Sequence, residues 1–111
     1  MSSNKRRFER YDNPTGLFNI TTDKRNWYEI GLVDISAGGM KFTSPASFDV
    51  DDSIHAVLMI RNKLKDNILN LDGIVKRRDE VGEGINSYAV EFANLKDSQI
   101  TNLSEIMFFV K

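Results

Sequence analysis

The feature that most restricts the fold of this chain is a series of short stretches with an apolar residue at every second position. In the segment "SIHAVLMIR", Ile54, Ala56, Leu58 and Ile60 fall on one side of an extended chain. The segments "GGMKFTS" and "SYAVEFANL" repeat the alternation. A period of two puts alternate side chains on opposite faces of a strand, so each stretch predicts a strand with one buried face.

Turn-forming residues separate these stretches, and together they predict about six strands in an all-β domain. The expected strands are residues 16–24, 26–36, 38–44, 53–61, 67–77 and 87–95. Pro45 closes the third strand because proline cannot donate a hydrogen bond to a neighbouring strand. Gly82 and Gly84 in "DEVGEG" can adopt positive φ, which predicts a hairpin between the last two strands.

The periodicity changes only near the C-terminus. From Ser98 onward, apolar residues recur three and four positions apart, at Ile100, Leu103, Ile106, Met107 and Val110. This spacing predicts an amphipathic C-terminal helix, with Asp97 or Ser98 as its N-cap. We expect the helix to cover an open end of the sheet or barrel, where its apolar face can be buried.

The composition is that of one globular domain. A chain of 111 residues with 41% hydrophobic residues can bury a core without disulfides or a structural metal. The absence of cysteine excludes a disulfide framework, a zinc-thiolate cluster and a thiol nucleophile. The longest purely apolar run, Ile106 to Val110, is too short to cross a bilayer. We therefore expect a soluble, cytoplasmic protein with no membrane span.

Charge is balanced over the whole chain but not at its N-terminus. The net charge is −1, yet the first ten residues carry Lys5, Arg6, Arg7 and Arg10 against a single Glu9. We expect residues 1–12 to form a flexible basic arm ahead of a single domain over residues 13–111. The sequence pI of 5.8 argues against a general nucleic-acid coat, which shows basic character over a whole face.

Two groups of residues have the chemistry of a nucleotide site. Arginine offers fixed donors that pair with phosphate oxygens or with the edge of guanine. In "DISAGG", Asp34 can accept hydrogen bonds from a guanine base, Ser36 supplies a compact hydroxyl, and glycine lets a ligand approach the backbone. Each group alone is a weak signal, because an arginine-rich terminus is more often a solvated arm.

Taken together, the two groups resemble a known signature. Arg6-x-x-x-Arg10, followed by Asp34-x-Ser36-x-x-Gly39, is similar to the R-x-x-x-R and [D/N]-x-S-x-x-G pair of the PilZ family. The later segments "GIV" and "YAVEF" stand in the order and rough spacing of two further strands of that family. The resemblance covers nearly the whole chain. It implies a six-stranded antiparallel β-barrel with a C-terminal helix, which binds cyclic di-GMP.

The resemblance also assigns roles to the arm. It implies that Arg6 and Arg10 hold guanine and phosphate, with Arg7 as a third contact. Binding would order the arm against the barrel and change a surface that a downstream effector protein reads. No cofactor beyond this ligand is expected.

Asp34 and Ser36 should contact the ligand from the barrel surface, and Gly39 should keep the turn tight. The sequence departs from the family at Lys76, where an aromatic residue is common, and at Ala89, where glycine is common. Neither departure removes a ligand contact named above. The resemblance therefore favours a member that is able to bind.

Other functions have weaker support. His55 is the only histidine and there is no cysteine, so we expect no metal site. No residue pattern offers a nucleophile with a base, so we expect no enzyme. Two alternatives remain: a PilZ-fold interaction module with an idle ligand site, or a small barrel that binds single-stranded nucleic acid through the arm and exposed aromatics such as Trp27 and Tyr28. The intact signature disfavours the first, and the acidic body of the chain disfavours the second.

Overall fold

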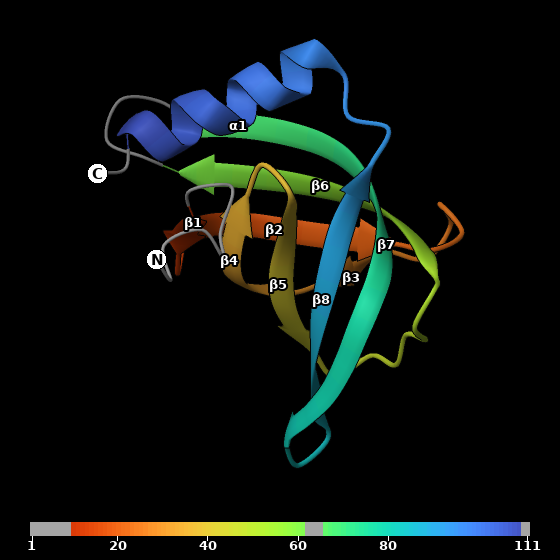
Figure 1. The fold of residues 1–111 in the computed structure, drawn as a ribbon. Coiled ribbons are helices and arrows are strands. Elements are labelled where there is room, and N and C mark those ends of the chain that lie inside the picture. The colour runs from red at the N-terminus through yellow and green to blue at the C-terminus, as the bar shows by residue number, and fades with distance from the viewer. Residues whose placement is uncertain (1–9, 62–65, 110–111) are drawn as a thin grey trace, which may run out of the picture.

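An eight-stranded antiparallel sheet followed by one helix makes up the protein in a computed structural model, which describes residues 10–61 and 66–109 (Figure 1). The side chains are described as far as residue 106. The strands are β1 (Arg10–Asp12), β2 (Thr15–Thr21), β3 (Tyr28–Glu29), β4 (Gly31–Ser36), β5 (Gly39–Ser44), β6 (Ser53–Arg61), β7 (Asp66–Gly82) and β8 (Ile85–Ala93), and the helix is α1 (Asp97–Phe109).

The sheet is rolled rather than flat. Its strand order is β1-β4-β5-β8-β7-β6-β2-β3, so β3 and β4 lie near opposite edges. Yet Ile30 is the single residue between these two strands in the chain. The backbone N–H of Ile30 donates to the carbonyl of Phe18 at 2.9 Å, which holds this crossing against β2. The two edges of the sheet must therefore curl toward each other, as in a barrel (Figure 1).

The all-β class is confirmed, but the prediction of about six strands is wrong, because the described residues form a sheet of eight. The expected strand over residues 26–36 is divided at Ile30 into β3, which pairs with β2, and β4, which pairs with β1 and β5. The other addition is β1, in a segment where only a basic arm was expected. Alternation reports which face a residue takes but not which strand is its partner, so the sequence pattern does not show this division.

The inward-facing residues are those that the alternation predicts. Met40 and Phe42 of β5 are buried, as are Tyr88, Val90 and Phe92 of β8. The alternating residues of β6 that the sequence pattern singled out are buried as well. One face of the curled sheet thus supplies a continuous apolar core, and the opposite face is left for polar chemistry.

A buried hydroxyl attaches the irregular segment between β5 and β6 to this core. The side chain of Tyr88 is fully buried and stacks on Phe42, with 5.1 Å between ring centroids. Its hydroxyl donates to the carbonyl of Ala46 at 2.8 Å and accepts from the N–H of Phe48 at 3.0 Å. Two backbone groups of a loop are thereby satisfied without water.

The strand β7 is longer than the sequence pattern predicts. Its first part pairs with β6 and its second part with β8, and the hairpin with β8 extends away from the rest of the sheet (Figure 1). The predicted hairpin is confirmed, with the connection reduced to Glu83 and Gly84. Gly84 has φ of +73°, whereas Gly82 does not adopt positive φ.

The predicted C-terminal helix is confirmed, although it begins slightly earlier than expected. The carbonyl of Lys96 accepts the first helical bond, from the N–H of Ile100 at 3.1 Å. The N–H of Lys96 in turn donates to the side-chain oxygen of Gln99 at 2.7 Å. Lys96 is therefore the N-cap in place of Asp97 or Ser98, and Gln99 provides the side-chain half of a capping box.

The helix α1 lies across one end of the rolled sheet, beside β7 (Figure 1). Leu103 and Ile106 are fully buried in the core, as the stripe predicts, while Ile100 is 41% exposed. The predicted stripe positions Met107 and Val110 lie outside the described side chains. Among the described residues, no helix combines the length and apolar character needed to span a membrane.

Candidate ligand-binding site

The pairing of β1 with β4 brings the two sequence motifs together. In this antiparallel pair Arg10 lies opposite Ser36, and Asp12 lies opposite Asp34. Directly opposite residues share a face of the sheet, with their Cβ atoms about 5 Å apart. The second arginine of R-x-x-x-R therefore lies beside the aspartate and serine of D-x-S-x-x-G.

Two carboxylates flank the guanidinium of Arg10. Its Nε lies 2.7 Å from Oδ1 of Asp12, and its Nη1 lies 3.9 Å from Oδ2 of Asp34. The side chain of Arg10 stays 37% exposed, while that of Asp34 is only 17% exposed. Exposed ion pairs contribute little to stability, so the effect of these contacts is to aim the guanidinium along the outer face of the sheet.

A β-bulge is what places Asp34 on that outer face. The register between β4 and β5 shifts between Leu32, which lies opposite Phe42, and Asp34, which lies opposite Lys41. Without the extra residue, Asp34 would lie opposite Met40, which faces the core. The inserted residue turns the carboxylate outward, as bulges near functional sites often do.

The hydroxyl of Ser36 closes the turn between β4 and β5. It accepts a hydrogen bond from the N–H of Gly38 at 3.2 Å and lies 3.5 Å from the carbonyl oxygen of Gly39. The carbonyl of Gly38 accepts from the N–H of Phe92 at 3.0 Å, which fastens the turn to β8. Ser36 thus has a local structural role in addition to the ligand contact that the family resemblance implies.

Gly39 permits a close contact between strands. A Cβ atom at this position would lie 2.1 Å from the backbone oxygen of Val90 on β8. Its φ is not in the positive region, so the glycine is required by the proximity of β8 rather than by an unusual turn conformation. Its predicted contact with a ligand stays a prediction.

The described residues therefore place together Arg10, Asp34 and Ser36, with Gly39 at the start of β5. Arg6 and Arg7 lie outside the described residues, as does most of the predicted arm over residues 1–12. The last part of that segment is the strand β1. Asp12 was not predicted from the sequence, although a carboxylate two positions from Arg10 was a signal that a second acidic group shares its face.

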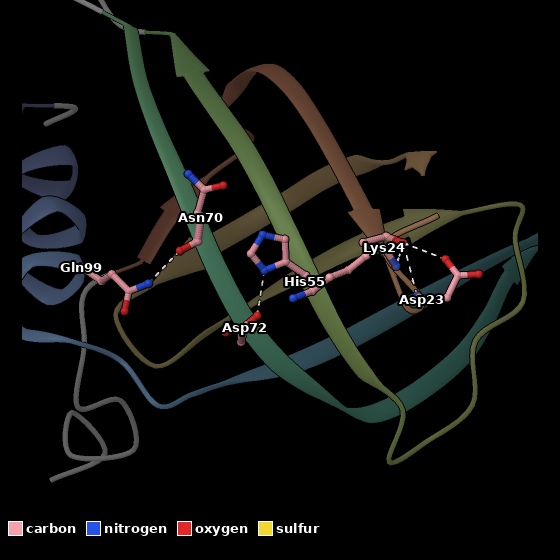
Figure 2. Close-up of polar contacts among 7 residues, drawn as sticks. Asp23, Lys24, His55, Asn70, Asp72 and Gln99 are labelled. Atoms are coloured by element: carbon pink, nitrogen blue, oxygen red, sulfur yellow. Dashed lines mark hydrogen bonds and ion pairs between the residues drawn. The ribbon is translucent and has the colours of Figure 1, made fainter. Parts of the chain in front are cut away.

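The only histidine lies on a different part of the outer surface. The Nδ1 atom of His55 on β6 is 2.7 Å from Oδ1 of Asp72 on β7 (Figure 2). The rings of Trp27 and His55 pack in a T-shaped arrangement, with 6.1 Å between their centroids. Within the part of the chain that the structure describes, no three acidic or histidine side chains are grouped as metal ligands. In the order of the sheet, the strands β5 and β8 lie between Asp34 on β4 and Asp72 on β7, and β6, which carries His55, is the next strand after β7.

The loop between β2 and β3 is held by Asp23 (Figure 2). The backbone N–H groups of Asn26 and Arg25 each donate to Oδ1 of Asp23 at 2.8 Å. These bonds, together with those from the Asn26 amide and the Thr21 hydroxyl, lower the pKa of Asp23 from 3.8 to about 2. Thr21 is buried and receives the N–H of Lys24 at 2.8 Å.

The family assignment comes from a family model described as the PilZ domain, which matches residues 4–109. The chain belongs to the PilZ family. The match includes both signature motifs, so the resemblance inferred from the motifs is confirmed. No curated protein sequence matches the chain.

Several solved structures share its fold at low sequence identity. The inhibitor of motility MotI/DgrA from Bacillus subtilis has a TM-score of 0.79 and 15% identity, over 93% of this chain and 49% of its own. The PilZ domain of YcgR from Escherichia coli, with c-di-GMP, has a TM-score of 0.70 and 19% identity, over 94% and 89%. The MrkH–c-di-GMP complex from K. pneumonia has a TM-score of 0.74 and 18% identity, over 95% and 52%. The chain thus spans about half the length of MotI/DgrA and of MrkH.

Proposed function

We propose that this chain is a receptor for cyclic di-GMP rather than an enzyme. The observation that carries the proposal is the pairing of β1 with β4, which places Arg10 beside Asp34 and Ser36 on one exposed face. The YcgR domain and MrkH, both of the same fold, have structures with c-di-GMP. The family and the geometry of the two motifs therefore support the same ligand.

The chemistry of these side chains suits a dianion that carries two guanines. The guanidinium of Arg10 offers paired N–H donors to a phosphate or to the O6 and N7 edge of guanine. Asp34 accepts hydrogen bonds, and so it suits the N–H donors of a guanine rather than a phosphate. The nearby cation reduces the repulsion between this carboxylate and an anionic ligand.

The arm completes the site in this proposal. Arg6 and Arg7 add phosphate and guanine contacts, and their binding orders residues 1–12 against the domain over residues 13–111. The ordered arm changes the surface beside β1 and β4, which a partner protein reads. This relay would operate in the cytoplasm, and nucleic acid has no part in it.

Calorimetric titration of the purified chain with cyclic di-GMP tests the proposal. We expect a micromolar or tighter dissociation constant, about −8 kcal/mol, with GMP and a short oligonucleotide as weak competitors. Asp34→Asn should weaken binding by about 1.5–3 kcal/mol, since a charge-assisted hydrogen bond is lost with little change in shape. The matched control is Asp72→Asn, on the outer face of β7, which should bind as the wild type does.

Two results would contradict the proposal. Absence of heat, together with no shift in melting temperature on adding ligand, would favour the interaction module with an idle site. Competition by the oligonucleotide at the same concentration as cyclic di-GMP would favour the nucleic-acid-binding barrel.

A further inference from the structure

The outer face of the sheet continues beyond Asp34 as a row of directly opposed residues. Asp34 on β4 lies opposite Lys41 on β5, Lys41 lies opposite Ala89 on β8, and Ala89 lies opposite Arg77 on β7. Opposite residues share a face, so Lys41 is the next outward side chain after Asp34, on the side away from β1. The bulge in β4 creates this juxtaposition, because it aligns Asp34 with an outward position of β5.

The charges along this row are not equally available to a ligand. Arg10 already has a carboxylate of Asp12 at 2.7 Å, and Arg77 has one of Asp79 at 2.7 Å. Lys41 is exposed, and its ammonium forms no ion pair with any other residue that the structure describes. An anion can therefore approach Lys41 without displacing a protein carboxylate.

The residues next to Lys41 on the outer face include two with little or no side chain. Gly39, which precedes it on the same face of β5, has no side chain, and Ala89 across the strand pair has only a methyl group. The exposed Glu91 lies opposite Gly39 on this face, and its carboxylate is 4.0 Å from the ammonium of Lys76. Along its own strand, Lys41 has only Gly39 on this face before the turn that carries Ser36. Its ammonium can reach a ligand that lies over that turn.

We propose that Lys41 is a further ligand-contacting residue of this site, where it binds the phosphate of cyclic di-GMP that lies farther from the arm. The inference rests on the proposed function. A ligand with two phosphates requires cationic contacts at two places, and Arg10 and Lys41 lie on either side of Asp34. The carboxylate of Asp34 is then flanked by cations on both neighbouring strands, which permits a dianion to bind beside it.

The test compares Lys41→Gln, Lys41→Arg and the control Lys96→Gln by calorimetric titration with cyclic di-GMP. Gln keeps most of the length and polarity of lysine but removes the charge, and Lys96 is an exposed lysine at the start of α1. We expect Lys41→Gln to lose affinity about tenfold, as for a lost charge-assisted contact, and Lys41→Arg to stay near the wild type. Lys96→Gln should also stay near the wild type.

A second measurement separates a direct contact from the general field of the protein. Part of the affinity lost in Lys41→Gln should persist at high salt, because salt removes the effect of distant charges but screens a close contact less. Equal losses for Lys41→Gln and Lys96→Gln, or an Arg variant as weak as the Gln variant, would overturn the role of Lys41. Wild-type binding with an unaffected Lys41→Gln would overturn it while leaving the proposed function intact. A wild type that does not bind at all would overturn both.

Discussion

Replacing Tyr88 by Phe tests how the core holds the loop between β5 and β6. The change removes one buried oxygen and leaves the ring, which is fully buried against Phe42, in place. The N–H of Phe48 and the carbonyl of Ala46 then lose their bonds of 3.0 Å and 2.8 Å to the hydroxyl. An unsatisfied buried polar group costs about 1–3 kcal/mol. Since the segment can relax toward water at Ala46, we expect a total loss of about 2–4 kcal/mol.

Urea unfolding followed by far-ultraviolet circular dichroism measures this loss, which corresponds to a fall in melting temperature of roughly 10 °C or more. The matched control is Tyr28→Phe, because Tyr28 is 38% exposed and its ring packs on that of Phe48 in a T-shaped arrangement, with 5.5 Å between centroids. The control should change stability by less than about 0.5 kcal/mol. If Tyr88→Phe unfolds at the same urea concentration as Tyr28→Phe, the two hydrogen bonds do not anchor the loop and the reasoning is wrong.

Three further outcomes are expected. Gly39→Ala should lower the free energy of unfolding, measured in urea, by about 1–3 kcal/mol, because the new Cβ would meet the backbone of β8. In the control Gly82→Ala, the new Cβ has no atom within 4 Å, so the stability should stay near that of the wild type. Equal stabilities of the two variants would argue against the close approach of β8 to Gly39. Asp23→Asn should be less stable than the wild type at neutral pH, and the difference should vanish in acid. Because the pKa of Asp23 is depressed in the folded protein, its carboxylate stabilises the fold above pH 3.8, and this contribution is lost as the pH falls through about 2. A difference that persists unchanged below pH 2 would contradict the loop geometry. Arg10→Ala should stay within about 0.5 kcal/mol of the wild-type stability, since the ion pairs of Arg10 are partly exposed. Its affinity for cyclic di-GMP should nevertheless fall at least about tenfold. An unchanged affinity in a titration would show that Arg10 is not part of the site.

The candidate site was predicted in part because its residues occur in two short motifs. Asp34 and Ser36 lie two residues apart on β4, so their proximity to each other follows from the sequence. The position of Arg10 next to them does not, because it depends on a strand pair between segments that are far apart in the chain. The outward orientation of Asp34 was also not predictable from alternation. It depends on the extra residue in β4, and the alternating pattern does not show where a β-bulge occurs.

Lys41, the further ligand contact proposed here, belongs to neither sequence motif. Its position in the sequence marks it as an outward residue of a strand, and nothing in that pattern connects it with Asp34. The connection appears only when the register of β4 against β5 is known. A shift of that register by one residue would turn one of the two side chains to the opposite face.

The sequence by itself determined the features that depend on neighbouring residues: the all-β class, the buried faces of β5, β6 and β8, the hairpin at Gly84 and the C-terminal helix. These follow from alternation, turn chemistry and helical spacing, which act within a few residues. Only the tertiary structure decided that the expected strand over residues 26–36 changes partner at Ile30, and that β1 joins the sheet beside β4. The physical reason is that strands pair through hydrogen bonds between backbone segments that are distant in the chain. Because the backbone N–H and C=O groups are the same in every strand, the local sequence does not specify which strand they pair with.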